Sequence, residues 1–169
     1  AHTGWREVKG QWQYLMANGA LDDESIDVEL PGEFLSMGRY CLPHIIEDEV
    51  EAIKTSLSFL HIGKQHITYP AYAYAFLAPL TSILDPIPNF SAYFYGETGS
   101  FKSTVATLLL SHFGNFSISN LSNFDSTANQ IEKRAFVLKD TLQVLDDYHP
   151  SASHKEASAK EAIAQRLIR

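Results

Sequence analysis

The stretch "YFYGETGSFKSTVATLLLSHFG", residues 93–114, decides the fold that we predict for this chain. An apolar run over residues 90–95 predicts a β-strand, and residues 104–112 predict a helix that is closed by Gly114. Between them, residues 96–103 follow the pattern G-x-x-x-x-G-K-[ST] with one departure, because Phe101 stands in place of the second glycine. The order strand, loop and helix is that of a phosphate-binding loop.

Such a loop binds phosphate because successive backbone N–H groups point into one concavity and the positive end of a helix follows. Gly96 and Gly99 allow the turns, Lys102 would reach the β- and γ-phosphates, and Ser103 would place its hydroxyl on Mg²⁺. We therefore expect ATP and magnesium as ligands. The predicted cofactor-binding residues are Gly96, Glu97, Thr98, Gly99, Ser100, Phe101, Lys102, Ser103 and Thr104. Phe101 suits this loop if its φ is negative and its ring points away from the phosphates.

A second motif follows some forty residues later, in "LQVLDD", residues 142–147. Four strand residues followed by two aspartates have the form of a Walker B element. We predict that Asp146 and Ser103 hold the metal, and that Asp147 orients or deprotonates the attacking water. Lys102 and Asp147 are thus the predicted catalytic residues. The alternative for the aspartates is helix capping at the exit of a strand.

The rest of the chain divides by composition into three segments. Residues 1–43 look β-rich, with strands around a Lys9-Gly10 turn and over residues 26–30. Residues 44–88 predict a helical linker, with helices over 46–62 and 69–84. Residues 89–169 form the predicted nucleotide-binding core. Its elements are strands at 90–95, 116–120 and 141–150 and helices at 104–112, 126–140 and 153–169. Strands joined through helices predict a parallel sheet.

Composition narrows the function classes. The 169 residues are 45% hydrophobic and 20% charged, which is ordinary for a folded domain, and the net charge of −7 gives no support for nucleic-acid binding. One cysteine, Cys41, excludes an internal disulfide. No signal peptide or membrane-spanning run is visible, so we expect a cytoplasmic protein without membrane contact. The first residue is alanine, which suggests a piece of a longer protein.

Four stretches together suggest a family. They are "HTGWREVKGQWQYL", "YGETGSFKSTVATLLLSHFG", "STANQIEKRAFVLKDTLQVLDDYHPS" and "KEASAKEAIAQRLIR", in that order along the chain. They resemble the P-loop ATPase domains, of the domain-of-unknown-function type, in primase–helicases of bacterial phages, plasmids and mobile elements. The resemblance covers most of the chain and is weakest over residues 44–88. A phosphate loop with Gly-Ser-Phe-Lys is similar to the form seen in that group.

The resemblance implies an α/β fold of the P-loop NTPase type, RecA- or AAA-like, truncated after the Walker B strand. It also implies an ATP-hydrolysing, helicase-like domain that acts on DNA during replication of a mobile element, as a homo-oligomeric ring. The family's Walker A residues map to Gly96, Gly99, Lys102 and Ser103, and its Walker B residues to Asp146 and Asp147. Two alternatives stay open: a P-loop kinase, and a non-catalytic domain with a degenerate loop that acts through protein interactions.

Overall fold

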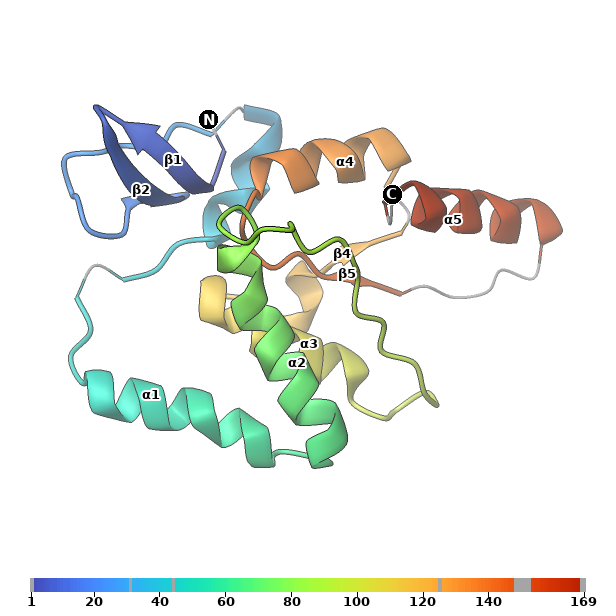
Figure 1. The fold of residues 1–169 in the computed structure, drawn as a ribbon. Helices are drawn as coiled ribbons and strands as arrows, with labels where there is room; N and C mark the ends of the chain where they lie inside the picture. The colour runs from blue at the N-terminus through green and yellow to red at the C-terminus, as the bar shows by residue number, and fades with distance from the viewer. Residues whose placement is uncertain (1, 31, 44, 125, 148–152, 168–169) are drawn as a thin grey trace.

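A computed structural model describes residues 2–30, 32–43, 45–124, 126–147 and 153–167. Its strands are β1 (Gly4–Val8), β2 (Gln11–Met16), β3 (Gly19–Ala20), β4 (Ser122–Asn123) and β5 (Leu145–Asp146). Its α-helices are α1 (Glu49–Ser58), α2 (Gln65–Leu77), α3 (Lys102–Leu110), α4 (Ala128–Val137) and α5 (His154–Leu167), shown in Figure 1. Short 3₁₀ helices span Gly32–Arg39, Phe59–His61, Ala78–Leu80, Ser111–Phe113 and Ile118–Asn120.

The N-terminal hairpin forms as its alternating sequence predicts. β1 and β2 are antiparallel, with Trp5 opposite Tyr14, and the two-residue turn has positive φ at both Lys9 (52°) and Gly10 (81°). Two left-handed residues give the turn the twist that the flanking strands need. The strand expected over residues 26–30 is wrong, because Asp23 forms a side-chain turn instead. Its Oδ1 accepts from the Ser25 N–H at 2.9 Å, and Ile26 N–H bonds back to its carbonyl at 3.2 Å.

The helical segment is confirmed with shifted boundaries. α1 begins after Asp48, whose side chain accepts a hydrogen bond from Glu51 N–H at 2.9 Å, and it passes into a 3₁₀ turn at Phe59. α2 begins at Gln65 rather than at residue 69, so Pro70 lies inside the helix. Thr68 Oγ1 donates to the Leu60 carbonyl at 2.8 Å and thereby ties the two helices together.

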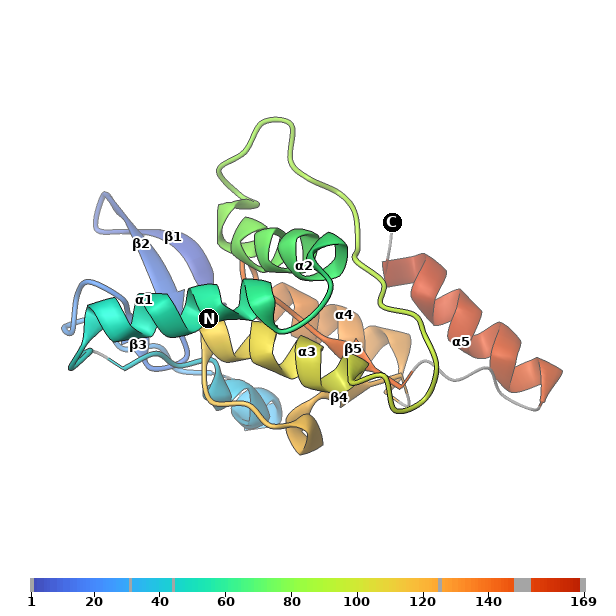
Figure 2. The same ribbon diagram turned by 90° about the horizontal axis from the view of Figure 1, so that it is seen from below.

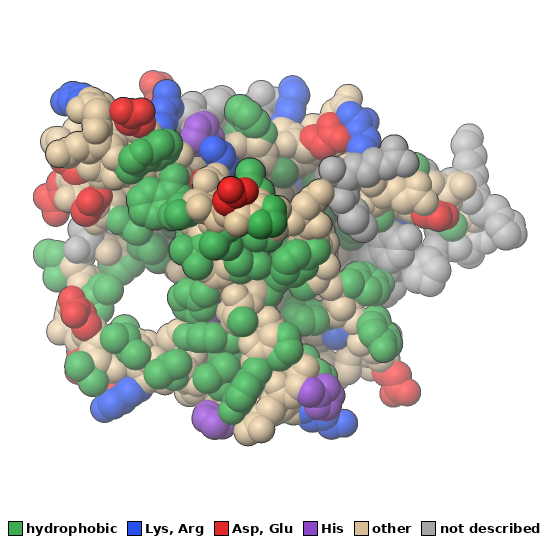
Figure 3. Space-filling model, viewed as in Figure 1, with side chains coloured by type: hydrophobic (Ala, Val, Ile, Leu, Met, Phe, Trp, Pro, Cys, Tyr) green, Lys and Arg blue, Asp and Glu red, His purple; other side chains and the backbone are tan. Residues whose placement is uncertain are grey.

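α1 is attached to the core mainly through one of its flanks. Ser56 Oγ forms one hydrogen bond with Tyr72 Oη at 2.7 Å and another with His112 Nε2 at 2.8 Å. No residue of α1 is buried. In Figure 3 an opening separates α1 from the part of the molecule that carries the hairpin. The outer side of α1 therefore remains exposed.

The parallel sheet is smaller than the sequence predicts. β4 and β5 pair in parallel, with Ser122 opposite Leu145, and α4 connects them. Thr127 begins α4 through a reciprocal capping box with Gln130, as the sequence suggested. The expected strand at 116–120 is a 3₁₀ turn, because Ser117 and Asn120 bond to each other's backbone. The strand expected over 141–150 is limited to β5, and its residues 148–150 lie outside the described residues.

Residues 90–95 are the main correction to the predicted fold, because they are not in a strand. Ala92, Tyr93, Phe94 and Tyr95 line the same cavity as Leu145 and Asp146 of β5. Within the described residues, Ser91, Ala92, Phe94 and Tyr95 make no backbone hydrogen bond. An apolar alternating sequence becomes a strand only when a neighbouring strand accepts and donates along its edge. The described chain pairs β5 with β4 instead.

One hydrophobic core joins the three segments of the chain. In Figure 1, β4 and β5 lie between α4 and α3, and Figure 2 shows α2 beside α3. Buried side chains from the hairpin, the helical segment and the C-terminal segment form one cluster: Tyr14, Met16, Met37, Tyr40, Phe59, Ala71, Ala75, Leu109, Leu110, Phe113, Val137, Leu138 and Leu142. The architecture is mixed α/β with a small parallel sheet.

The hairpin is anchored to this core by Asp140, a buried carboxylate that is 8% exposed. Asp140 accepts hydrogen bonds from Ser82 Oγ at 2.6 Å and from Trp5 N–H at 3.1 Å, and its backbone carbonyl accepts from Tyr14 Oη at 2.5 Å. Burial, with a further contribution from the Asp140 charge, raises the pKa of Tyr14, so its hydroxyl stays a donor. A side chain at Gly4 would collide with Asp140, which explains glycine there.

Candidate functional site

The predicted phosphate loop stands directly before α3. The first hydrogen bond of this helix runs from Val105 N–H to the Phe101 carbonyl at 2.9 Å. The N–H groups of Lys102, Ser103 and Thr104 therefore have no partner inside the helix and mark its positive end. Gly99 has a φ of 82°, a conformation that glycine adopts without strain. The loop thus presents backbone donors and a helix N-terminus together, as phosphate binding needs.

The lysine of the motif folds back over this loop. Its Nζ donates to the carbonyl oxygens of Gly96 at 2.9 Å and Glu97 at 2.8 Å, and to Ser100 Oγ at 3.2 Å. Ser100 N–H and Oγ in turn bond to the Glu97 carbonyl, which closes the loop locally. The positive charge of Lys102 therefore lies beside the Gly96 and Glu97 carbonyls of the loop.

Phe101 fills the second glycine position in a way that the sequence did not predict. Its φ is 59° and its ψ is 23°, so the residue is left-handed, and the negative φ that was the condition for a side chain at this position is not met. The backbone geometry that a glycine would supply is kept in spite of the side chain. The ring is 74% exposed and therefore does not fill the loop. A left-handed residue with a side chain costs roughly 1–2 kcal/mol, so this position is strained.

This strain predicts that glycine is better than alanine at position 101. Relative to Phe101→Ala, Phe101→Gly should be more stable by about 0.5–1 kcal/mol, because both remove the ring and only glycine removes the strain. Denaturant unfolding of the two variants measures the difference. Leu108, in the middle of α3, is the matched control, since there the glycine variant should be the less stable of the pair. An alanine variant as stable as the glycine variant at position 101 would contradict the left-handed geometry.

The two motifs meet in one cavity of about 740 Å³. Every predicted site residue except Glu97 lines it: Gly96, Thr98, Gly99, Ser100, Phe101, Lys102, Ser103, Thr104, Asp146 and Asp147. Asp146 is the last residue of β5 and lies opposite Asn123 of β4. Asp147 follows with a φ of 67°, which turns the chain at the end of the strand. Residues some forty positions apart in the sequence are therefore neighbours.

The donor set suits magnesium better than a transition metal. Within the part of the chain that the structure describes, no group of three His, Cys, Asp or Glu side chains could hold a metal ion. Magnesium needs no such group, because it is usually held by one or two carboxylates, water and substrate phosphates. Ser103 and Asp146 offer a hydroxyl and a carboxylate in the same cavity. The residues present therefore fit a magnesium ion that arrives with a nucleotide.

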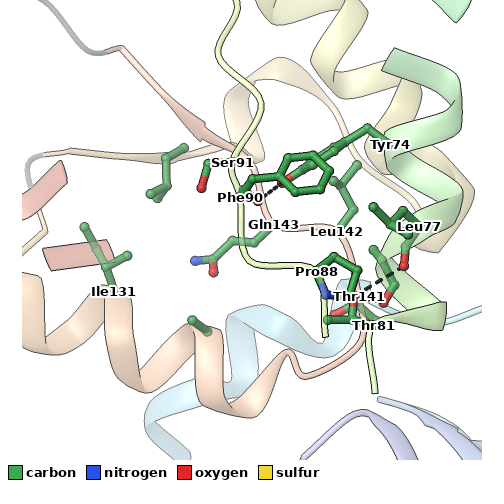
Figure 4. Close-up of a pocket in the computed structure, with 13 residues that line it drawn as sticks. Tyr74, Leu77, Thr81, Pro88, Phe90, Ser91, Ile131, Thr141, Leu142 and Gln143 are labelled. Carbon is green, nitrogen blue, oxygen red and sulfur yellow. Dashed lines mark hydrogen bonds between the residues drawn. The ribbon is translucent and has the colours of Figure 1, made fainter. Parts of the chain in front are cut away.

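A second cavity of about 310 Å³ adjoins the first, and both share Tyr74, Leu142, Gln143 and Leu145 in their walls. In Figure 4, Phe90 and Ser91 lie on one side of it and Gln143 lies across from them. Tyr74 Oη donates to the Phe90 carbonyl at 3.2 Å. Gln143 Nε2 is buried and has no hydrogen-bond partner among the described residues.

Sequence reasoning missed Gln143 as a candidate. It is an amide donor two residues before the strand-end Leu145-Asp146 pair, and it borders both cavities. The signal was present, because Gln143 is the one polar residue in the apolar run of residues 142–145. A polar side chain inside such a run has to be bonded, or be available to a ligand.

The comparisons with known proteins identify the family of this chain but no activity. The sequence model of the family described as "Domain of unknown function (DUF927)" matches residues 60–163, which is more than half of the chain. No curated protein and no solved structure matches the chain. Within the described residues, no helix is long and apolar enough to cross a membrane. The match includes α2, the phosphate-loop motif, α4 and β5. The chain therefore belongs to the DUF927 family.

Proposed function

We propose that this domain binds Mg-ATP in the cavity between residues 96–104 and the Asp146-Asp147 pair. One observation carries the proposal: a loop with the phosphate-binding pattern and a strand that ends in two aspartates line the same cavity. Either feature alone occurs by chance in many proteins. Both together, in the order and at the places that nucleotide hydrolysis requires, favour a nucleotide site.

In this proposal the loop binds the phosphates through backbone donors. The N–H groups at the start of α3 and the left-handed Gly99 and Phe101 face the β- and γ-phosphates. Lys102 leaves its present carbonyl partners for phosphate oxygens, which are better acceptors for an ammonium because they are charged. The affinity then depends mainly on this lysine and the helix N-terminus.

The aspartates and Ser103 complete the site. Ser103 Oγ and the Asp146 carboxylate would hold Mg²⁺, which neutralises the phosphate charge that develops during hydrolysis. Asp147 would orient the attacking water or accept its proton. An arginine that stabilises the transition state would come from elsewhere, as in other enzymes of this chemistry.

We extend the proposal to DNA by resemblance alone. The motifs occur in the order known from helicase-like domains of mobile-element replication proteins, and such domains hydrolyse ATP as rings on DNA. The acidic net charge of −7 does not favour DNA binding by the outer surface as a whole. DNA contact would therefore be local, for instance in the channel of a ring.

A non-catalytic domain is the second candidate, and the absence of a β-strand over the described residues 90–95 favours it. The phosphate loop is usually held by a paired strand on one side and a helix on the other. Here the helix is present, and the preceding segment makes no backbone hydrogen bonds at Ser91, Ala92, Phe94 and Tyr95 within the described residues. A loop held on one side only would bind nucleotide weakly.

ATP turnover separates the two candidates. The experiment measures phosphate release by this chain with Mg-ATP, with single-stranded DNA added, and with magnesium removed by a chelator. We expect that ATP turnover needs magnesium. We also expect that single-stranded DNA raises the turnover several-fold, because bound DNA would order the catalytic site. Turnover without DNA stimulation would support an ATPase and contradict the helicase-like role. A lack of turnover together with a lack of ATP binding would favour the non-catalytic domain.

A further inference from the structure

α1 carries an apolar stripe along its exposed side. Val50, Ile53 and Leu57 follow each other at helical spacing, and they are 61%, 59% and 46% exposed. Ile46, just before the helix, continues the stripe and is 52% exposed. Figure 3 shows hydrophobic side chains following α1 along this face of the molecule. Four large apolar side chains in one row are more than the scattered exposure that is normal for a protein surface.

The core does not use this stripe, because α1 meets the core through a different side. Ser56 reaches Tyr72 and His112, and the buried Phe59 follows at the end of the helix. On a helix of 3.6 residues per turn, Ser56 lies about 90° from the line through Val50, Ile53 and Leu57. The contacts of Ser56 therefore leave the stripe exposed.

The stripe has the symmetry that a second copy needs. Val50, Ile53 and Leu57 of α1 and the half-exposed Leu60 of the following 3₁₀ helix are spaced symmetrically about residue 55. If two copies of α1 pack antiparallel about this point, Val50 meets Leu60 of the second copy and Ile53 meets Leu57 of the second copy. A twofold contact requires such a self-complementary pattern.

The charges at the two ends of α1 favour the same arrangement. Glu47 and Glu49 are exposed at its beginning, and the positively charged Lys64 is exposed beyond its end. Antiparallel packing brings the acidic end of each copy to the basic end of the other. Parallel packing would bring like charges together, which costs several kcal/mol at an interface. The one basic residue within α1, Lys54, already lies 4.0 Å from Glu51 of its own helix.

We propose that α1 is a self-association surface, in which two copies of this chain pack their α1 helices antiparallel about a twofold axis. The contact joins the stripe Val50–Ile53–Leu57 to the same stripe on the second copy. It is separate from the nucleotide cavity, so it stands or falls without the proposed function. It also differs from a ring contact, which would join two different surfaces head to tail.

Sedimentation equilibrium over a range of protein concentrations tests the stripe. We expect a monomer–dimer equilibrium for the unchanged chain. The dissociation constant of Ile53→Glu should be at least tenfold higher, because a carboxylate between the two α1 helices has to be desolvated. Ile87→Glu is the matched control, since Ile87 is 65% exposed and lies outside α1. A chain that remains monomeric at every concentration overturns the proposal, and so does an Ile87 variant that dissociates as much as the Ile53 variant.

Charge exchange tests the antiparallel direction. One variant carries Glu47→Lys and Glu49→Lys, and the other carries His61→Glu and Lys64→Glu. Each variant alone brings like charges together, so its dissociation constant should rise by about tenfold or more. The mixture of the two should form a heterodimer near the original affinity, because opposite charges face each other again at both ends. Failure of the mixture to associate better than either variant alone would overturn the antiparallel contact.

Discussion

Lys102→Ala should lower the affinity for Mg-ATP by about a hundredfold or more. The Nζ atom now bonds to the Gly96 and Glu97 carbonyls at the mouth of the loop, from which it can turn to phosphate oxygens. A hydrogen bond to a charged group contributes about 1.5–3 kcal/mol, and two of them correspond to about two orders of magnitude or more in affinity. Titration calorimetry with Mg-ATP measures the change.

Two further variants make this result specific. Lys139→Ala removes an exposed lysine outside the loop and should leave the affinity unchanged. Lys102→Arg keeps the charge but replaces a compact ammonium by a planar fork, so it should bind between the unchanged chain and the alanine variant. The present bonds of Lys102 are exposed, and the alanine variant should therefore unfold at nearly the original temperature. Unchanged affinity in Lys102→Ala would remove the loop from the nucleotide site.

Asp140→Ala should destabilise the fold by about 2–4 kcal/mol, the largest stability effect that we expect. The substitution leaves Trp5 N–H, which is half-buried, without its acceptor at a residue that is only 8% exposed, whereas the exposed Ser82 hydroxyl can turn to water. A donor that loses its partner away from water costs about 1–3 kcal/mol, and alanine at the φ of 55° of this position adds about 1 kcal/mol of strain. For a chain of this size the loss corresponds to a fall of roughly 5–15 °C in the melting temperature.

Calorimetric melting of three variants tests whether the Asp140 side-chain oxygens, as hydrogen-bond acceptors, stabilise the fold. Asp140→Asn keeps a side-chain oxygen and tolerates the φ of 55° at this position, so it should lose less than half as much stability. Asp27→Ala removes an exposed carboxylate near the hairpin and should change the melting temperature little. If Asp140→Ala melts with the unchanged chain, Asp140 is not the anchor between the hairpin and the core.

Local sequence patterns were sufficient to predict the helices and the loop before α3. α1 and α4, which Asp48 and Thr127 cap, begin within three residues of the predicted starts, and the Lys9-Gly10 turn fixes the hairpin register. Each of these features depends on a few neighbouring residues. The loop before α3 belongs to the same class, because its pattern of glycines and Lys102 is continuous in the sequence. The Asp146-Asp147 pair stands at the end of β5, as its Walker B pattern predicted, but its place in the same cavity as the loop does not follow from paired parallel strands, because residues 90–95 are not in a strand.

Features that depend on distant partners were not predictable. Residues 90–95 have the composition of a strand, but pairing is decided by what lies beside them, and β5 pairs with β4. The periodicity of α1 correctly predicted a helix, whereas the exposure of its apolar residues depends on the packing of Ser56 against Tyr72 and His112. The left-handed Phe101 and the unpartnered Gln143 amide are likewise set by the surrounding chain.

The central claim is that residues 96–104 and the Asp146-Asp147 turn form one nucleotide site. Amide hydrogen exchange of the chain, measured with and without Mg-ATP, tests it most directly because each segment reports separately. We expect slower amide exchange in the loop and in residues 143–147 together, and loss of both effects in Lys102→Ala. Unchanged exchange in both segments at saturating Mg-ATP, or protection confined to another part of the chain, would contradict it.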